Sequence, residues 1–309
     1  MIYRQLGRTG IDVSIVSFGA GPVSGWVKME DLDEQIGVVK HAVDVGINWF
    51  DTAATYGEGR SEIALGRALA EIGAADNVHV ATKVRLNDEA FADIRGFVFR
   101  SFAESLKRLQ LEKVTLLQLH NSVTTQRGDQ PTSITPADVL GPNGVLAAFE
   151  ELRMSGFVRH LGITGLGDIA SMKAVINSGR FDTVQTPFNL LNPSAGQTIP
   201  ADFHDADYGN IFVDCQRQRM GVFAIRVFAG GALADRAPSA HTKITKFFPM
   251  DLYERDRERA RAIAATLRDG LTLPEAAVKF SLAHPAVTSA LIGFATTNEI
   301  DEVVRYASG

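Results

Sequence analysis

Short apolar runs alternate with longer amphipathic segments along most of the chain. The runs are continuously apolar rather than alternating, as expected for strands covered on both faces. The predicted strands are residues 15–20, 47–52, 78–84, 114–120, 160–165, 183–189, 222–228 and 289–294. Helical spacing of apolar positions predicts helices between them, including 32–45, 61–72, 90–109, 145–155 and 169–178. Eight strand–helix units in 309 residues predict an α/β fold, a (β/α)8 TIM barrel.

A doubly wound open sheet is the alternative architecture. Such a sheet usually carries Gly-x-Gly-x-x-Gly in its first βαβ unit, and this motif is not present there. The length of the chain would allow two domains, but barrels of this size often form one. Because no linker-like stretch interrupts the pattern, we expect residues 1–309 to form a single domain.

Three stretches fall outside the eightfold pattern. Residues 4–13 predict a small β-hairpin that turns at residues 8–10, and we expect it to close the bottom of the barrel. Long loops follow the fourth and seventh predicted strands, at residues 122–144 and 230–250. Loops of this length are uncommon and are often functional, so both are candidates for shaping a site.

The composition is that of an ordinary globular protein, with 45% hydrophobic and 22% charged residues and a net charge of −5. No Lys/Arg run indicates a nucleic-acid partner, and no apolar run approaches the ~20 residues that span a membrane. The only cysteine, Cys215, falls in a predicted helix at 211–219, where we expect it to be inert. A lone cysteine and an N-terminus without a signal-peptide pattern predict a cytoplasmic location. The scattered histidines predict no metal site.

Ionisable residues stand where the second, third and fourth predicted strands end. Asp51, Lys83 and His120 occupy these positions, and Tyr56 follows Asp51 by one short loop. The carboxyl ends of strands are where α/β folds form active sites. A neighbouring ammonium lowers the pKa of a phenol from its usual value of about 10, and a carboxylate keeps the ammonium charged. This quartet is therefore suited to moving a proton to or from a carbonyl or alcohol oxygen, with a cofactor to accept hydride.

Each member of the quartet also has a simpler explanation. Asp51 would serve as a turn cap, Lys83 as a lysine whose stem is buried, and His120 or Tyr56 as a hydrogen-bonded core residue. A different chemistry is also open, because a lysine on a barrel strand can form a Schiff base in an aldolase or lyase.

The segment Phe50-Asp51-Thr52-Ala53-Ala54-Thr55-Tyr56-Gly57, followed by Ser61-Glu62 and Leu65-Gly66, resembles the signature of the aldo-keto reductase superfamily. Matching motifs run nearly from end to end of the chain. They are Leu6-Gly7-Arg8-Thr9-Gly10, Ala81-Thr82-Lys83, Ser105-Leu106-Lys107-Arg108-Leu109, Leu119-His120, Gly156-Phe157-Val158-Arg159-His160-Leu161-Gly162-Ile163 and Ser289-Ala290-Leu291-Ile292-Gly293.

This resemblance implies a (β/α)8 barrel that binds a nicotinamide cofactor, NAD(P)(H), in extended form without a Rossmann domain. It implies Tyr56 as the general acid/base, Lys83 and Asp51 as its tuning pair, and His120 as the donor that orients the substrate. Because all four residues of the quartet match one family signature, a shared catalytic role is favoured over a separate structural role for each residue.

The resemblance also implies cofactor contacts from Gly19, Ala20, Asp51, Thr164, Gln185, Ile225, Arg226, Gly293, Ala295 and Glu299. Gln185 matches the glutamine that binds the carboxamide. The usual Ser-Asn of the family is Thr164-Gly165 here. Thr164 keeps a side-chain hydroxyl, but Gly165 has no side-chain amide. Ile225 stands where a tyrosine often stacks on the nicotinamide, so aliphatic packing is expected there.

The last predicted helix begins near residues 293–299, and its free N–H groups suit a phosphate. NADP-dependent members of the family usually have Arg or Lys in this stretch, whereas here Glu299 stands about where the arginine is found. A carboxylate repels a 2′-phosphate but accepts a hydrogen bond from a ribose 2′-OH, which predicts NAD over NADP. A basic residue folding over from Arg236, Lys243 or Lys246 could instead give a preference for NADP.

Residues 163–166 and 224–231 are similar to the sugar dehydrogenase branch of the family. That branch includes the L-galactose, L-fucose and D-threo-aldose dehydrogenases, which oxidise the anomeric carbon to a lactone. The candidate substrate contacts are Trp26, Tyr56, His120 and Asn121, with Arg226 and the polar loop 122–144 around them. The alternative is a cofactor-binding, redox-sensing regulatory subunit, and the sequence leaves a homo-oligomer open.

Overall fold

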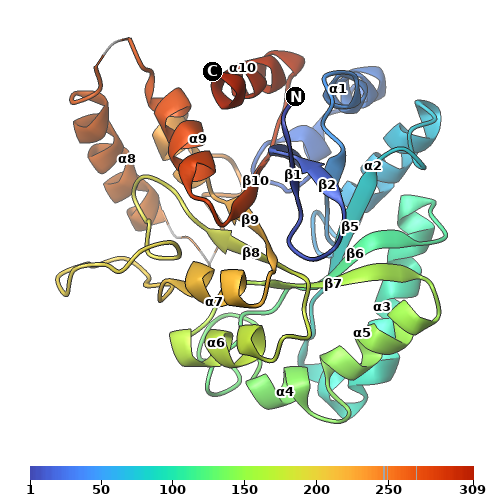
Figure 1. Ribbon diagram of the computed structural model, residues 1–309. Helices are drawn as coiled ribbons and strands as arrows, with labels where there is room; N and C mark the ends of the chain where they lie inside the picture. The colour runs from blue at the N-terminus through green and yellow to red at the C-terminus, as the bar shows by residue number, and fades with distance from the viewer. Residues whose placement is uncertain (246–247, 249, 269) are drawn as a thin grey trace.

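Eight parallel strands close into a barrel in the computed structural model, in the order β10-β3-β4-β5-β6-β7-β8-β9 (Figure 1). The structure describes residues 1–245, 248, 250–268 and 270–309. The predicted (β/α)8 barrel is confirmed, and an open sheet is excluded by the closed strand order. The strands are β3 (Val16–Gly19), β4 (Trp49–Asp51), β5 (His79–Val84), β6 (Val114–Leu119), β7 (Val158–Thr164), β8 (Thr183–Pro187), β9 (Gly221–Ile225) and β10 (Val287–Ile292).

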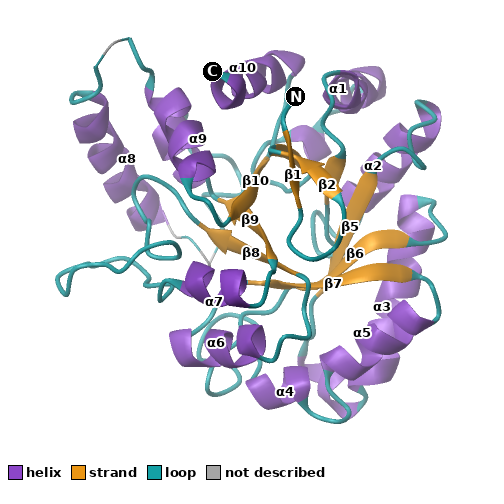
Figure 2. Cartoon of the chain, in the orientation of Figure 1, coloured by secondary structure: helices purple, strands orange, loops and turns teal. Residues whose placement is uncertain are grey.

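Helices surround these strands, as Figure 2 shows. One main helix follows each strand: α1 (Leu32–Asp44), α2 (Arg60–Glu71), α3 (Ile94–Leu109), α5 (Val145–Met154), α6 (Ile169–Asn177), α7 (Ile211–Arg217), α9 (Leu273–Ala283) and α10 (Thr297–Ser308). Additional helices lie in the connections: η1 (Trp26–Lys28), η2 (Asp88–Ala92), α4 (Pro136–Leu140), η3 (Ala229–Ala234) and α8 (Met250–Ala264).

Most predicted bounds lie within one or two residues of the observed ones, and two elements depart further. The helix predicted at 90–109 is divided into η2 and α3, because Asp93 takes an extended conformation and its side chain accepts from the Gly96 N–H at 2.8 Å. The strand predicted at 222–228 ends at Ile225, since Arg226 adopts a left-handed φ of 55° that turns the chain away from the barrel.

The predicted hairpin is present and closes the amino-terminal end of the barrel. Its strands β1 (Tyr3–Gln5) and β2 (Asp12–Ser14) are antiparallel. Leu6, Ile11 and Val13 pack inside the barrel on a layer formed by Trp49, Ala81, Leu116 and Phe223. Gly7, with φ of 52°, approaches β9 so closely that a Cβ would lie 2.3 Å from the Gly221 nitrogen. Only the carboxyl-terminal end of the barrel is therefore left for a polar site.

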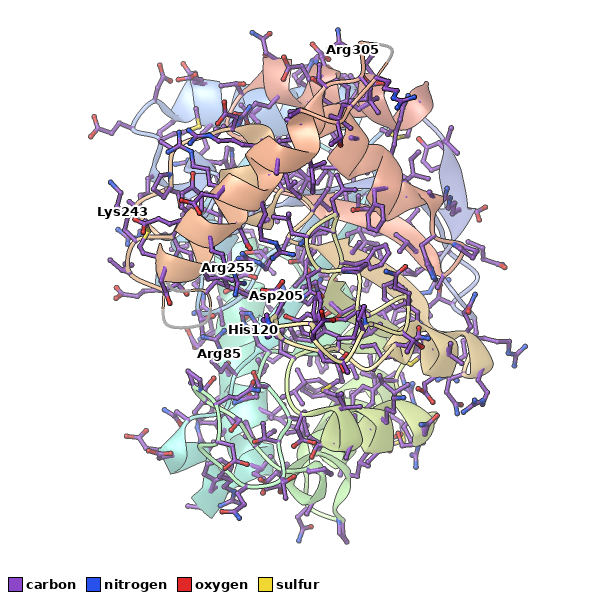
Figure 3. The ribbon with its side chains drawn as sticks, turned by 90° about the vertical axis from the view of Figure 1, so that its left-hand side faces the viewer. Arg85, His120, Asp205, Lys243, Arg255 and Arg305 are labelled. Atoms are coloured by element: carbon purple, nitrogen blue, oxygen red, sulfur yellow. The ribbon has the colours of Figure 1, made fainter. Side chains whose placement is uncertain are left out.

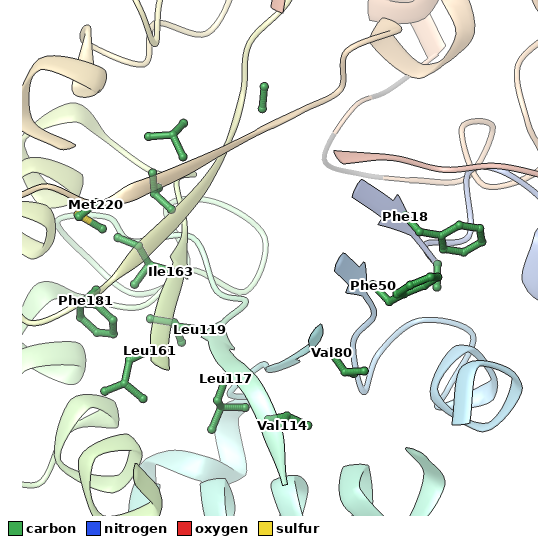
Figure 4. Packing of buried hydrophobic residues seen from close by; sticks show 14 of the residues in the cluster. Phe18, Phe50, Val80, Val114, Leu117, Leu119, Leu161, Ile163, Phe181 and Met220 are labelled. Atoms are coloured by element: carbon green, nitrogen blue, oxygen red, sulfur yellow. The ribbon is translucent and has the colours of Figure 1, made fainter. Parts of the chain in front are cut away.

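The largest apolar core lies between the barrel and its helices (Figure 4). Phe18, Phe50, Leu117, Leu161 and Phe181 are all fully buried in it. Burying each such side chain contributes roughly 1.5–3 kcal/mol. This packing fixes the register of the strands, and the register in turn sets which residues meet at their carboxyl ends.

The long loops are held over the carboxyl-terminal end of the barrel. In the loop after β6, Val123 pairs with Ile134 and with Gly167, and α4 begins with a capping box between Thr135 and Asp138. The loop after β9 begins with η3, while Lys246, one of its candidate basic residues, lies outside the described residues. Across the part of the chain that is described, no helix has the length and apolar character needed to cross a membrane.

Candidate active site

The barrel brings the four candidate residues together because their strands are neighbours. β4 pairs with β5 and β5 with β6, with Asp51 beside Ala81 and Lys83 beside Gln118. Tyr56 lies in the turn after β4, and His120 directly follows β6. All four therefore reach the same end of the barrel, which the hairpin leaves open.

Lys83 is the centre of this group and is only 1% exposed. Its ammonium donates to Oδ1 of Asp51, to the Thr52 carbonyl at 2.8 Å and to Oη of Tyr56 at 3.4 Å. An ammonium has three N–H donors, so these bonds use its full capacity. The lysine is consequently fixed between a carboxylate and a phenol.

The charge state of Lys83 follows from this geometry. Burial opposes the charged form, but the Asp51 carboxylate and the Tyr56 phenol outweigh burial and raise the pKa of Lys83. Burial raises the pKa of Asp51, although the Lys83 ammonium and the Gln185 amide act against the rise. We therefore treat Asp51 and Lys83 as a charged pair, which is the only state that satisfies both buried groups.

His120 faces the Tyr56 ring edge-on, with ring centroids 5.4 Å apart. Its Nδ1 lies 3.3 Å from Oγ1 of Thr55. Burial holds the pKa of His120 well below 6.5, and the positive charges of Arg85 and Lys83 lower it further. A neutral imidazole beside a phenol offers one N–H donor without adding charge.

Ser61 and Glu62 form hydrogen bonds with residues adjacent to this group. Oγ of Ser61 lies 2.6 Å from the Ala20 carbonyl, to which it donates, and 2.7 Å from Oγ1 of Thr52. Glu62 is fully buried, and its carboxylate accepts from Arg108 Nε at 2.7 Å and from Thr82, the residue before Lys83. These bonds tie α2 to both strands that carry the ion pair.

Several residues predicted to contact a cofactor are also neighbours. Thr164 on β7 pairs with Gln185 on β8, and Ile225 ends the next strand. Nε2 of Gln185 donates to Oδ2 of Asp51 at 2.5 Å, while Oγ1 of Thr164 accepts from Gln118 at 3.1 Å. A carboxamide lying here would meet a hydroxyl and an amide next to the ion pair, so these residues fit the end of a nicotinamide cofactor.

The seam between β3 and β10 requires small residues. A Cβ at Gly19 would lie 3.2 Å from the Ile292 carbonyl oxygen, and one at Gly293 would lie 3.0 Å from Cβ of Ser24. The Ala20 carbonyl is already occupied by the Ser61 hydroxyl. These backbones leave little room for larger side chains at the edge where a cofactor would cross the barrel.

Glu299 forms its own contacts at the start of α10. Its Oε2 accepts from the Ala295 N–H at 2.6 Å, and its Oε1 pairs with Arg236 from the loop after β9. Of the three basic residues considered for this site, Arg236 therefore does fold over. Lys243 is exposed and is labelled at the edge of the molecule in Figure 3.

Two of the predicted substrate residues, Trp26 and Asn121, form contacts with other parts of the protein. Trp26 is fully buried, donates its indole N–H to the Gln35 carbonyl at 3.0 Å and packs edge-on against Phe18. Asn121 is fully buried, and its amide donates to the carbonyls of Leu86 and Thr132. Both side chains are buried by these bonds, and their contacts with a substrate stay predictions.

The sequence analysis missed Arg85 and Tyr208. Arg85 follows β5 directly and lies next to His120 in Figure 3, and its position after a strand-end lysine was an available signal. Tyr208 is buried in the connection after β8, where no pattern marks it. Tyr208 lines a cavity of about 260 Å³ together with Arg226 and with Ser122, which lies two residues after His120.

Comparison with known proteins agrees with this geometry. The model of the aldo/keto reductase family matches residues 16–308. The chain belongs to this family. It is 28% identical to L-galactose dehydrogenase of Arabidopsis thaliana over 307 residues, covering 97% of this chain and 86% of that protein. It is 27% identical to D-threo-aldose 1-dehydrogenase of a Pseudomonas species over 327 residues, covering 97% and 91%.

A solved relative shows the same fold. The holo form of aldo-keto reductase AKR11C1 from Bacillus halodurans superposes with a TM-score of 0.74 at 22% identity, over all of this chain and 91% of that one. Family membership and the dehydrogenase relatives identify this chain as an oxidoreductase of the aldo-keto reductase type.

The lowered pKa of His120 predicts that its ring stays neutral between pH 8 and about pH 6. Ring ¹⁵N–¹H spectra of histidine-labelled protein, with His120 assigned from a His120→Asn variant, should show no titration midpoint near 6.5. Because protonation favours the unfolded chain, His120 should lower stability as the pH falls below 6.5. A midpoint at or above 6.5 would contradict the assignment of a neutral donor.

Proposed function

We propose that this oxidoreductase uses a nicotinamide cofactor to interconvert a sugar hemiacetal and its lactone, or a related alcohol and carbonyl. The observation that carries the proposal is the position of the Lys83 ammonium, which bonds to both the Asp51 carboxylate and the Tyr56 hydroxyl. This arrangement links a fixed positive charge to the one phenol at the site. We assign Tyr56 as the general acid/base on that ground.

In the oxidative direction, the reacting hydroxyl lies between Oη of Tyr56 and the imidazole of His120. In the form of Tyr56 whose oxygen carries no proton, the substrate proton moves to that oxygen, and the Lys83 ammonium beside it stabilises the negative charge it carries beforehand. His120 donates a hydrogen bond to the same substrate oxygen and holds it in place. Thr164 and Gln185 would hold the nicotinamide carboxamide, and the bound dinucleotide would supply the hydride acceptor or donor.

The substrate class is proposed from the relatives and from the polar surroundings of the site. Two relatives matched over nearly the whole chain are named as sugar dehydrogenases. The loop after β6 contributes Ser122, Gln130 and Pro131 to the cavity beside His120, and the connection after β8 contributes Asn189 and Asn192. A hydroxyl-rich ligand finds hydrogen-bonding groups there.

The alternatives are less well supported. A Schiff-base aldolase needs a neutral, accessible amine, whereas Lys83 is buried and the Asp51 carboxylate helps to keep it protonated. A regulatory subunit that only binds the cofactor would have no need for the assembled Asp51, Tyr56, Lys83 and His120. Turnover would separate an enzyme from a regulatory subunit.

We also propose that NAD is preferred over NADP. Arg236 is already paired with Glu299, and Glu299 also accepts from the Ala295 N–H at the start of α10. A 2′-phosphate would have to compete with a carboxylate for this arginine, whereas a ribose 2′-OH could donate to the same carboxylate.

A Tyr56→Phe variant should lose cofactor-dependent turnover by about 10²–10⁴-fold, because the proton acceptor is removed while the ring remains. A panel of aldoses and simple aldehydes, assayed with NAD⁺, NADP⁺ and the reduced cofactors, provides the measurement. Tyr3→Phe, which alters an exposed tyrosine at the opposite end of the barrel, is the matched control. Full turnover in Tyr56→Phe would exclude the assignment, and borohydride trapping of substrate on Lys83 without cofactor would favour an aldolase.

Glu299→Gln should shift the ratio of kcat/KM for NADP⁺ to that for NAD⁺ upward by about tenfold, because it removes a negative charge and releases Arg236 for a phosphate. Glu302→Gln, an exposed change on the same helix, should leave the ratio near that of the unaltered protein. If the unaltered protein already has the larger kcat/KM with NADP⁺, and Arg236→Gln abolishes that advantage, the proposed preference is wrong.

A further inference from the structure

The cavity beside the candidate active site lies among the loops that follow β6, β7, β8 and β9. Its volume of about 260 Å³ is sufficient for a small sugar. Its lining includes Ser122, which lies two residues after His120 in the chain, and Pro187 and Arg226 place it at the ends of β8 and β9. Figure 3 shows His120 at this end of the barrel, with Asp205 and Arg255 nearby. The cavity is thus close enough to hold the part of a substrate that does not react.

Arg226 is the unusual residue of this cavity. Its backbone has a left-handed φ of 55°, and the Asn189 side chain donates to its carbonyl at 2.9 Å. Its guanidinium stacks on the Phe248 ring, 3.6 Å from the ring centroid. Unfavourable backbone geometry that is held by specific contacts is often found at ligand-binding positions.

The guanidinium of Arg226 lacks an acidic partner. Within the described ranges of the chain, no carboxylate forms an ion pair with it and no side chain or carbonyl accepts a hydrogen bond from it. Burial lowers the pKa of this guanidinium, and Tyr208 and Asp256 act against that effect. An arginine remains charged under these conditions, and stacking leaves the edge of its planar fork free to donate.

The acidic residues of the cavity are engaged with other groups. Asp205 bonds to Arg255 and, at 2.6 Å, to Arg259, while Asp256 lies 3.4 Å from Arg259 and 3.7 Å from Arg255. Asp207 is exposed and accepts from the Gly209 N–H at 2.7 Å. Asp205 and Asp256 therefore form their ion pairs with Arg255 and Arg259. Asp256 also acts on Arg226 electrostatically but forms no ion pair with it, so the edge of the Arg226 guanidinium remains available to a ligand.

Tyr208 supplies a second donor on the wall of the cavity. Burial raises the pKa of its hydroxyl to about 12, so the phenol keeps its proton. Its backbone N–H donates to Oγ of Ser194 at 3.0 Å, and its side chain lines the cavity. The stacked guanidinium and the protonated phenol are two donors on the wall of one small cavity. Because Asp205 and Asp256 pair with Arg255 and Arg259, these donors can still receive an anion.

We propose that Arg226 binds an anionic substituent of the substrate, a carboxylate or a phosphate carried at the end of the sugar remote from its reacting carbon. This inference rests on the proposed function and narrows its substrate class from neutral aldoses to acidic ones. A planar carboxylate can pair with both edge nitrogens of the guanidinium, and a phosphate can do the same. Tyr208 and Asn189 can donate to the remaining oxygens or to neighbouring hydroxyls.

Three probes that share one sugar configuration test the proposal: D-galactose, D-galacturonate and D-galactose 6-phosphate. With the full-length protein and NAD⁺, at least one anionic probe should have a kcat/KM about tenfold or more above that of D-galactose. The galacturonate and 6-phosphate arms identify which anion is preferred. Arg226→Met should remove the preference by raising KM for the anionic probe, and Arg226→Lys should restore part of it, because lysine keeps the charge but loses the fork.

Arg261→Met is the matched control, since it removes one exposed arginine from α8 without altering the cavity. Calorimetric titration of each variant with NADH measures the dissociation constant of the cofactor separately.

If Arg226→Met weakens NADH binding and lowers turnover of all three probes by the same factor, the arginine binds the cofactor and the inference is wrong. A kcat/KM for D-galactose that equals or exceeds those of both anionic probes also overturns it, while leaving the proposed function intact. No turnover with any probe or aldehyde would instead count against the proposed function.

Discussion

The buried ion pair between Asp51 and Lys83 is the interaction on which the site depends. Both side chains are at most 3% exposed. Removing one partner of such a pair leaves an uncompensated charge and typically costs about 3–5 kcal/mol. Here the pair also positions neighbouring groups. Lys83 donates hydrogen bonds to the Thr52 carbonyl and to Tyr56, and Asp51 accepts one from Gln185. One electrostatic constraint thus links the ends of the neighbouring strands β4 and β5, and the more distant strand β8, to the phenol assigned to proton transfer.

The two ends of the barrel differ in polarity, and this difference allows a buried ion pair at the carboxyl-terminal end. The hairpin fills the amino-terminal end with Leu6, Ile11 and Val13, which excludes water from that side. The carboxyl-terminal end instead receives polar side chains and loops. Positive charge collects there, because Asp51 offsets Lys83 while Arg85 lies beside His120 and Arg226 lines the cavity. Burial is the main reason that the pKa of His120 is low, and the charges of Arg85 and Lys83 lower it further. The positive charge at this end is also complementary to the anionic substrate proposed above.

The sequence is informative where the signal is local. Continuous apolar runs predict all eight strands, and residues at strand ends, such as Lys83, meet because neighbouring strands share a register. Contacts across long separations carry no such signal, and the pair between Arg236 and Glu299 joins positions 63 residues apart. The sequence around Trp26 and Asn121 likewise does not show that the Trp26 indole donates to the Gln35 carbonyl or that the Asn121 amide donates to the Thr132 carbonyl. The residue roles remain proposals that activity must test.

The most direct measurement is a double-mutant cycle on Asp51→Asn and Lys83→Met, followed by equilibrium unfolding and by cofactor-dependent turnover. The account predicts that each single change lowers the free energy of unfolding by about 3–5 kcal/mol, that the double variant recovers much of this loss, and that all three lose turnover. Additive losses of stability, or full turnover in Lys83→Met, would contradict the central role of the ion pair.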